Sequence, residues 1–428
     1  MSRIRVAGLV VLAACLVFAP GALPAQSTVE AIDLLNDVRF LASDDLGGRL
    51  IGSPGADTAA RFLARRFRQV GLVAPPGGWL QSFTVAPEAP AAAHTGLGGA
   101  TGKNVIGVLP GKDPELRNEI VIVGAHYDHL GLGYYWALDP DSAGAVHNGA
   151  DDNASGTAAL IHIARRLAPA PPARTVVFIA FSGEEPGLLG SAHYVRQPLF
   201  PLARTSAMVN LDMVGRLRDD RLLVYGAATA REFPALLDSL NTVNPWARFD
   251  LKASGDGWGR SDQSSFYGAG KPVLHLFTDL HEDYHRASDD WEKINADGLA
   301  RVADFTAELV RALANRREPL TFVNVPPPQV AITGPASSGY GAYLGTVPDM
   351  SENPGGVRLT GVRAGSPAEQ AGLRGNDIIV QIGEMPVTDL QTMTDALRSH
   401  RPGDVVEIRF VRDGQEQRVT VTLGSRGG

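Results

Sequence analysis

Short apolar runs alternate with helical patterns between residues 103 and 315, and this alternation constrains the fold more than any other feature. Nearly continuous runs of Val, Ile, Leu and Phe are typical of strands buried on both faces of a sheet. Their alternation with helices predicts an α/β fold with a mixed, largely parallel sheet between helices. Strands are predicted at 104–109, 119–124, 174–181, 207–213, 222–225 and 273–277, and helices at 156–167 and 289–315, with two more between 27 and 72.

A segment rich in Pro, Gly and Ser follows this region, as is typical of a linker between domains. The chain has 428 residues, which is more than one ordinary core accommodates. The predicted organisation is a signal peptide at 1–25, an α/β domain at 26–316, a linker at 317–338 and a small β-rich domain at 339–428.

The N-terminus has the pattern of an export signal. Arg3 and Arg5 precede an apolar run that is too short to span a bilayer as a mature helix, and small residues follow near Ala25. We therefore expect an exported protein, periplasmic or secreted, without a transmembrane span. Cys15, the only cysteine, ends a segment that resembles a lipoprotein cleavage box, so a lipid anchor stays open as the alternative.

The net charge of the chain argues against nucleic acid as a partner. The formal net charge of −7 leaves no basic footprint for nucleic acid.

Acidic residues and histidines lie where the predicted strands end. His126 and Asp128 close one apolar run, Glu184 and Glu185 follow a second, and Asp212 ends a third. A loop with His281 and His285 follows a fourth run, and Asp151 and Asp152 precede a helix. Since the carboxyl ends of parallel strands share one edge of a sheet, these side chains can converge.

Imidazole and carboxylate ligands together suit zinc, and a central carboxylate can hold two cations. His126 and Asp128 lie two apart on an extended segment, which suits a ligand and the acid that orients it. The neighbours Glu184 and Glu185 point in different directions, so that one can bind metal while the other acts as a base.

Five ordered motifs resemble those of the M28 peptidases, over roughly residues 28–316. They are Gly-Ala-His-Tyr-Asp-His-Leu-Gly at 124–131, Gly-Ala-Asp-Asp-Asn-Ala-Ser-Gly at 149–156, Phe-Ser-Gly-Glu-Glu at 181–185, Asn-Leu-Asp-Met-Val-Gly at 210–215 and Asp-Tyr-His at 283–285. The resemblance implies a zinc exopeptidase, most readily an aminopeptidase acting on peptides or proteins with free N-termini. A carboxypeptidase, a glutaminyl cyclase-like enzyme and a non-catalytic binding protein on the same fold remain alternatives.

The resemblance also implies the role of each residue. Asp151 is expected to bridge two zinc ions, with a cis peptide bond between it and Asp152. The remaining expected metal ligands are His126 and Asp212 for one ion, and Glu185 and His285 for the other. Glu184 is expected to be the general base, Asp128 to orient His126, and Tyr284 and Arg260 to contact substrate. His129 and His147 are expected to be ordinary loop residues.

Two further features complete the interpretation. The loop from Gly133 to His147 is longer than the M28 pattern and is expected to overhang the site. His281 and His285 also match the HExxH pattern of zincins, which requires a helix that nothing in the surrounding sequence predicts.

The region after the linker resembles a bacterial PDZ domain. Tyr343, Leu344, Gly345 and Thr346 match the loop that binds a peptide carboxylate, and Gly-Ser-Pro-Ala at 365–368 and Gly-Asn-Asp-Ile-Ile at 375–379 support the match. Such domains bind peptide C-termini by adding a strand to a sheet edge.

Overall fold

The computed structural model describes residues 25–324, apart from 88, 90, 91, 93, 94, 244–247, 256 and 260, and residues 342–424, apart from 349–354, 363, 364, 389–391, 394, 395 and 398. The predicted export segment with Cys15, most of the predicted linker and Arg260 lie outside these residues. The described residues form separate hydrophobic cores. The core of residues 342–423 shares no residue with the cores formed by residues 31–322.

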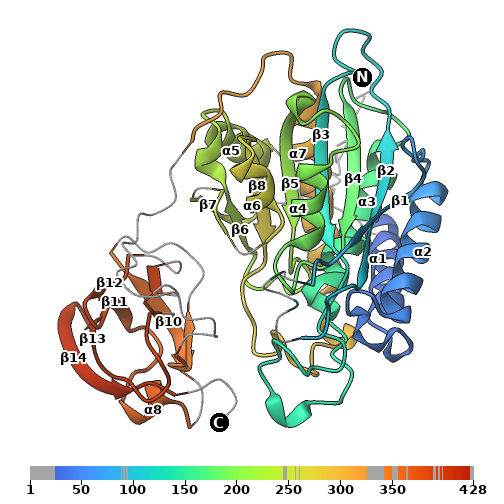
Figure 1. Cartoon of the computed structure of the whole chain (residues 1–428). Helices are drawn as coiled ribbons and strands as arrows, with labels where there is room; N and C mark the ends of the chain where they lie inside the picture. The colour runs from blue at the N-terminus through green and yellow to red at the C-terminus, as the bar shows by residue number, and fades with distance from the viewer. Residues whose placement is uncertain are drawn as a thin grey trace, which may run out of the picture.

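An eight-stranded mixed sheet is the centre of the first domain (Figure 1). Its order is β1-β2-β4-β3-β5-β8-β6-β7, with the parallel pairs β4–β3, β3–β5, β5–β8 and β6–β7. The strands are β1 (Leu80–Thr84), β2 (Thr101–Leu109), β3 (Ile120–His126), β4 (Thr175–Phe181), β5 (Thr205–Leu211), β6 (Arg221–Tyr225), β7 (Asp250–Ser254) and β8 (Val273–Phe277). The predicted α/β fold with a mixed, largely parallel sheet is confirmed.

Alternate residues of each central strand pack into different layers. Val121 and Val123 of β3 join the core formed with α1, α2, α3, α5 and α7, whereas Ile120 and Ile122 join the core formed with α4 and α6. The sheet is therefore buried on both faces, which explains the apolar runs. The helices are α1 (Ala25–Leu41), α2 (Pro54–Gln69), α3 (Gly156–Leu167), α4 (Leu189–Arg196), α5 (Phe233–Val243), α6 (Gln263–Gly268) and α7 (Ala296–Asn315).

Two predictions about these elements were wrong. The last helix begins at Ala296 rather than at Asp289, because the Asn295 side chain accepts a hydrogen bond from the backbone N–H of Gly298 and caps the helix there. The short helices α4, α5 and α6 were missed, and so were the edge strands β1 and β7, since neither strand has the continuous apolar run of a buried strand.

The second domain is an antiparallel sheet in the order β14-β13-β11-β10-β9, with β12 paired to β11. Its elements are β9 (Thr346–Pro348), β10 (Val357–Val362), α8 (Pro367–Gln370), β11 (Ile378–Ile382), β12 (Met385–Pro386), β13 (Val405–Arg412) and β14 (Gln415–Thr422). Nowhere in the described ranges is a helix both long and apolar enough to cross a membrane.

Candidate metal centre and active site

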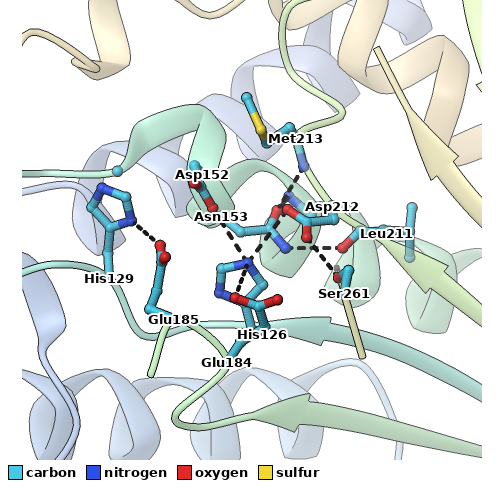
Figure 2. Close-up of polar contacts among 12 residues, drawn as sticks. His126, His129, Asp152, Asn153, Glu184, Glu185, Leu211, Asp212, Met213 and Ser261 are labelled. Atoms are coloured by element: carbon cyan, nitrogen blue, oxygen red, sulfur yellow. Dashed lines mark hydrogen bonds and ion pairs between the residues drawn. The ribbon is translucent and has the colours of Figure 1, made fainter. Parts of the chain in front are cut away.

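The carboxyl ends of the central strands bring the candidate residues together (Figure 2). β3 ends at His126, with β4 and β5 parallel to it on either side. Glu184 and Glu185 follow β4, and Asp212 follows β5 directly. The short helix η3 (Ala150–Ser155) precedes α3 and places Asp152 at the same edge of the sheet.

Asp152 lies at the centre of this cluster. Its Oδ1 is 3.3 Å from Nε2 of His126, and its Oδ2 is 3.3 Å from Nε2 of His285. Figure 2 shows Asp152 between His126 and the pair formed by His129 and Glu185. One carboxylate thus serves two groups of potential ligands, which is the arrangement expected of a bridging acid.

Asp151, the predicted bridging residue, has another role, and the prediction is corrected by one position. Its Oδ1 accepts a hydrogen bond from the backbone N–H of Gly215 at 2.6 Å, and its Oδ2 lies 3.1 Å from Nε2 of His281. The backbone departs from helical geometry at Asp152 and Asn153, so adjacent carboxylates point in different directions. The cis peptide bond likewise joins Asp152 to Asn153, not Asp151 to Asp152.

The first group of potential ligands is His126, Asp152 and Asp212, whose donor atoms lie within 4.8 Å of one another. Asp212 Oδ1 is 3.4 Å from His126 Nε2, and its Oδ2 accepts a hydrogen bond of 2.6 Å from the Ser261 hydroxyl. On its other ring nitrogen, His126 Nδ1 lies 3.2 Å from the carbonyl of Asp128. A carbonyl can only accept, so this contact leaves Nε2 with the lone pair that a metal needs.

The second group centres on Glu185. His285 Nε2 lies 3.0 Å from Glu185 Oε2, and His129 Nδ1 lies 2.7 Å from Oε1. His129, Asp152 and Glu185 also have donor atoms within 4.8 Å of one another. Although burial alone would raise it, the two histidines hold the pKa of Glu185 down to about 2. His129 was expected to be a loop residue, yet its side chain is fully buried against this carboxylate.

Glu184 is the carboxylate that neither ligand group uses. Its Oε2 is 4.0 Å from His126 Nε2, and its backbone N–H donates to Asp128 Oδ1 at 3.1 Å. Burial raises the pKa of Glu184 well above the usual range, against the effect of His126, and Glu185 and Asp212 raise it further. A raised pKa suits a group that must accept a proton and hold it.

Asp128 is expected to orient His126, and it contacts the imidazole mainly through its backbone carbonyl. The Asp128 carboxylate is 3.8 Å from His126 Nδ1, which is longer than a hydrogen bond. Burial raises the pKa of Asp128 to about 6. The carboxylate instead positions Glu184 by accepting from its backbone N–H.

The remaining predicted residues are placed as follows. The Tyr284 ring centroid lies 4.0 Å from that of His285, at the edge of the cluster, whereas Arg260 lies outside the described residues. His281 and His285 do not lie in a helix, so the zincin alternative lacks the helix that it requires.

In the second domain, the candidate carboxylate loop precedes the edge strand β9. Backbone hydrogen bonds of 2.8 Å pair Tyr343 with Gly424, and the buried Leu344 accepts from the N–H of Ala368. Gly345 has φ of 82°, and a Cβ there would lie 2.2 Å from the Cβ of Ser366. Glycine is therefore required at this position, and Thr346 begins β9.

The charge of the cluster tests whether metal ions fit it. Four carboxylates, those of Asp152, Glu184, Glu185 and Asp212, lie close together, and none forms an ion pair with Lys or Arg among the described residues. Buried carboxylates without cationic partners are costly, and mixed imidazole and carboxylate donors suit zinc. The residues present therefore fit divalent cations such as zinc.

Arg49, which was not among the predicted site residues, holds the backbone segments next to the cluster. The side chain of Arg49 is fully buried and donates to the backbone carbonyls of Tyr127, Asn148 and Gly149, at 2.6 to 2.9 Å, and to that of Leu41. It joins the segments before Asp128 and Asp151 to the end of α1. Burial lowers the pKa of Arg49 to about 10.

Comparisons with known proteins identify both regions of the chain. Residues 104–310 match Peptidase family M28, and residues 342–423 match the PDZ domain. Aminopeptidase YwaD of Bacillus subtilis (strain 168) is 31% identical over 230 residues, which cover 52% of this chain and 47% of that protein. The chain therefore matches about half of the length of that relative.

Two solved structures share the fold at low sequence identity. A Zn-dependent exopeptidase from Parabacteroides distasonis ATCC 8503 has a TM-score of 0.54 at 20% identity, covering 69% of this chain and 100% of that one. Porphyromonas gingivalis glutaminyl cyclase has a TM-score of 0.53 at 18% identity, covering 65% of this chain and 97% of that one. Residues 104–310 therefore form an M28 peptidase region, and a PDZ domain follows it at residues 342–423.

Proposed function

We propose that the chain is a di-zinc aminopeptidase that releases residues from the N-termini of peptides. The observation that carries the proposal is the carboxylate of Asp152, with one oxygen 3.3 Å from Nε2 of His126 and the other 3.3 Å from Nε2 of His285. His126, Asp152 and Asp212 would hold one ion, and Asp152, Glu185 and His285 the other.

His285 is the better ligand of the two histidines beside Glu185. Its Nδ1 faces the carbonyl of Trp136 at 2.9 Å, so Nδ1 carries the proton and Nε2 keeps its lone pair. His129 instead points Nδ1 at Glu185 Oε1 and would orient that carboxylate.

When bound, zinc supplies Lewis acidity that polarises the scissile carbonyl and acidifies a water molecule. Glu184 takes the proton of the attacking water and passes it to the leaving amine. The backbone N–H of Glu184 donates to the Asp128 carboxylate, and this hydrogen bond fixes the position of Glu184 relative to His126. The hydroxyl group of the water adds to the carbonyl carbon, the C–N bond breaks, and the proton carried by Glu184 goes to the departing nitrogen, which leaves as a neutral amine.

Replacing Glu184 with Gln tests the assignment, because Gln keeps the size of the side chain but cannot accept the proton. We expect kcat to fall by about 10²- to 10⁴-fold, with zinc content unchanged. Glu282→Gln is the matched control, since Glu282 is exposed one residue after His281. Full activity of the Glu184 variant would exclude the mechanism.

The zinc content and the products separate the alternative enzymes on this fold. Two zinc ions per chain and free amino acids from aminoacyl amides support an aminopeptidase. The likeness to a glutaminyl cyclase makes a second reaction worth assaying, and one zinc ion with cyclised N-terminal glutamine would support it. Release of C-terminal residues would support a carboxypeptidase, and bound peptide without turnover a binding protein.

We further propose that the PDZ domain binds peptide C-termini. β9 is the edge strand of its sheet, and the loop from Tyr343 to Thr346 leads into it. An added peptide strand would pair with β9 and place its carboxylate at this loop. Titration of the whole protein with a free-acid peptide and its C-terminal amide tests this, and equal affinities would contradict it.

The N-terminal pattern supports a proposal about location. Arg3, Arg5 and the apolar run that follows support export to the periplasm or the medium, with lipidation at Cys15 as the alternative. Cell fractionation followed by N-terminal sequencing tests both. A mature chain that begins near residue 26 supports cleavage, and one that begins at a modified Cys15 supports the anchor.

A further inference from the structure

The loop 133–147 holds the backbone of His285. The N–H of Leu138 donates to the carbonyl of His285 at 2.7 Å, and Nδ1 of His285 donates to the carbonyl of Trp136 at 2.9 Å. The φ of His285 is 54°, a sparsely populated conformation for a residue other than glycine. Such a conformation persists only where the surroundings hold it, and here this loop supplies the contacts.

The two carboxylate oxygens of Asp139 connect this loop to two other groups, the backbone of Ala287 and the ring of His147. Its Oδ2 accepts a hydrogen bond from the N–H of Ala287 at 2.9 Å, two residues after His285. Its Oδ1 lies 2.9 Å from Nε2 of His147, whose ring is fully buried at the base of the loop. The N–H of His147 in turn donates to the carbonyl of Gly131. One carboxylate thus connects the segment of His285 to a buried anchor near the end of β3.

Trp136, which supplies this carbonyl, is itself held by hydrophobic packing. Trp136 has φ of 62°, in the left-handed region that bulky side chains rarely adopt. Its indole packs against the hydrophobic cluster of Ile51, Phe83, Val85 and Leu97. The packed indole and the Asp139 carboxylate therefore fix the peptide group that accepts from His285.

We propose that Asp139 is a positioning residue that controls occupancy of one zinc site, the one formed by Glu185 and His285. By holding the Trp136 carbonyl at Nδ1 of His285, the loop fixes the tautomer and the direction of Nε2. The site of His126 and Asp212 has its own support in the Asp128 carbonyl and the Ser261 hydroxyl, so it does not depend on the loop. This inference rests on the proposed pair of zinc sites.

The test is a stepwise zinc titration against a chelating dye, using the full chain as wild type, Asp139→Ala, Asp139→Asn and Asp141→Ala. Asp139→Ala should weaken one zinc-binding step by about 10- to 100-fold and leave the other step within about twofold. Asp139→Asn should recover most of the loss, because its amide can accept from Ala287 and donate to a neutral His147. Asp141 is exposed in the same loop and serves as the control.

Two further readouts separate positioning from general damage. The absorption bands of the cobalt-substituted protein should change for one ion only in Asp139→Ala, and the unfolding midpoint of the metal-free variant should stay near that of wild type. Equal weakening of both steps, or no weakening, would overturn the proposal. If wild type itself binds fewer than two ions, the proposed function fails before the variants are compared.

Discussion

The carboxylate of Asp289 accepts a hydrogen bond from the backbone N–H of Asp152, with its Oδ2 3.0 Å from the nitrogen. The same oxygen accepts from the N–H of Asp151 at 2.9 Å, and Oδ1 accepts from Arg216 at 3.1 Å. Asp289 is fully buried. It therefore fixes the turn that directs Asp152 into the cluster and Asp151 toward Gly215 and His281.

Asp289→Ala should destabilise the metal-free protein by about 3 kcal/mol or more, because each hydrogen bond to a charged group contributes about 1.5–3 kcal/mol. Asp289→Asn should cost less, since the amide oxygen can still accept from both backbone N–H groups. Urea unfolding measures the difference, with exposed Asp219→Asn as the control. Equal stability of all three variants would contradict the role of Asp289.

Replacing Asp151 or Asp152 with Asn should have unequal effects on the amount of bound zinc. Asp152→Asn should lose most bound zinc, since it removes the one charge that faces both His126 and His285. Asp151→Asn should keep its zinc, because Asn can still accept from Gly215 and donate to His281. Zinc content after dialysis measures both, and loss of zinc in the Asp151 variant alone would restore the original prediction.

The two histidines beside Glu185 should also differ. His285→Ala should release one zinc ion, whereas His129→Ala should retain both and lower kcat by about tenfold or more through a misplaced Glu185. His129→Asn keeps a donor near the position of Nδ1 and should recover much of that loss. If His129→Ala releases a zinc ion and His285→Ala does not, the ligand and the supporting residue must be exchanged.

Asp262 gives a pH dependence that concerns the metal-free protein. It is fully buried, and burial raises its pKa from 3.8 to about 7. A carboxyl whose folded pKa is raised contributes stability that is present below pH 3.8 and is lost as the pH rises to about 7. The unfolding free energy should fall across this window, and Asp262 accounts for at most about 1.4 kcal/mol per pH unit.

The matched variant isolates this contribution. Asp262→Asn cannot ionise, so its unfolding free energy should fall less steeply between these pH values than that of wild type. Urea unfolding at several pH values, in the presence of chelator, gives both profiles. Parallel profiles would show that Asp262 does not titrate in this range.

Sequence patterns predicted the sheet because its strands are buried on both faces, and they located most of the site because strand ends share one edge. They failed where two adjacent residues of the same type could each supply the ligand. Nothing in the order Asp151, Asp152, Asn153 shows which carboxylate turns inward, since a non-helical backbone and the distant Asp289 decide it. His129 was missed because its partner, Glu185, is 56 residues away in sequence.

The supporting residues were missed for a related physical reason. Arg49 donates to backbone carbonyls, and Asp139 reaches the segment of His285 through the backbone N–H of Ala287; every sequence contains such groups. No residue type at the receiving end therefore signals the contact. In the second domain, the motif that included Gly345 was informative, since its positive φ and its close approach to Ser366 admit no other residue.

Anomalous diffraction from crystals of the zinc-loaded protein, recorded above and below the zinc edge, tests the shared carboxylate most directly. We predict two zinc peaks on either side of the Asp152 carboxylate, one beside His126 and Asp212 and the other beside Glu185 and His285. A single peak, or a pair of ions joined through Asp151, would contradict the account.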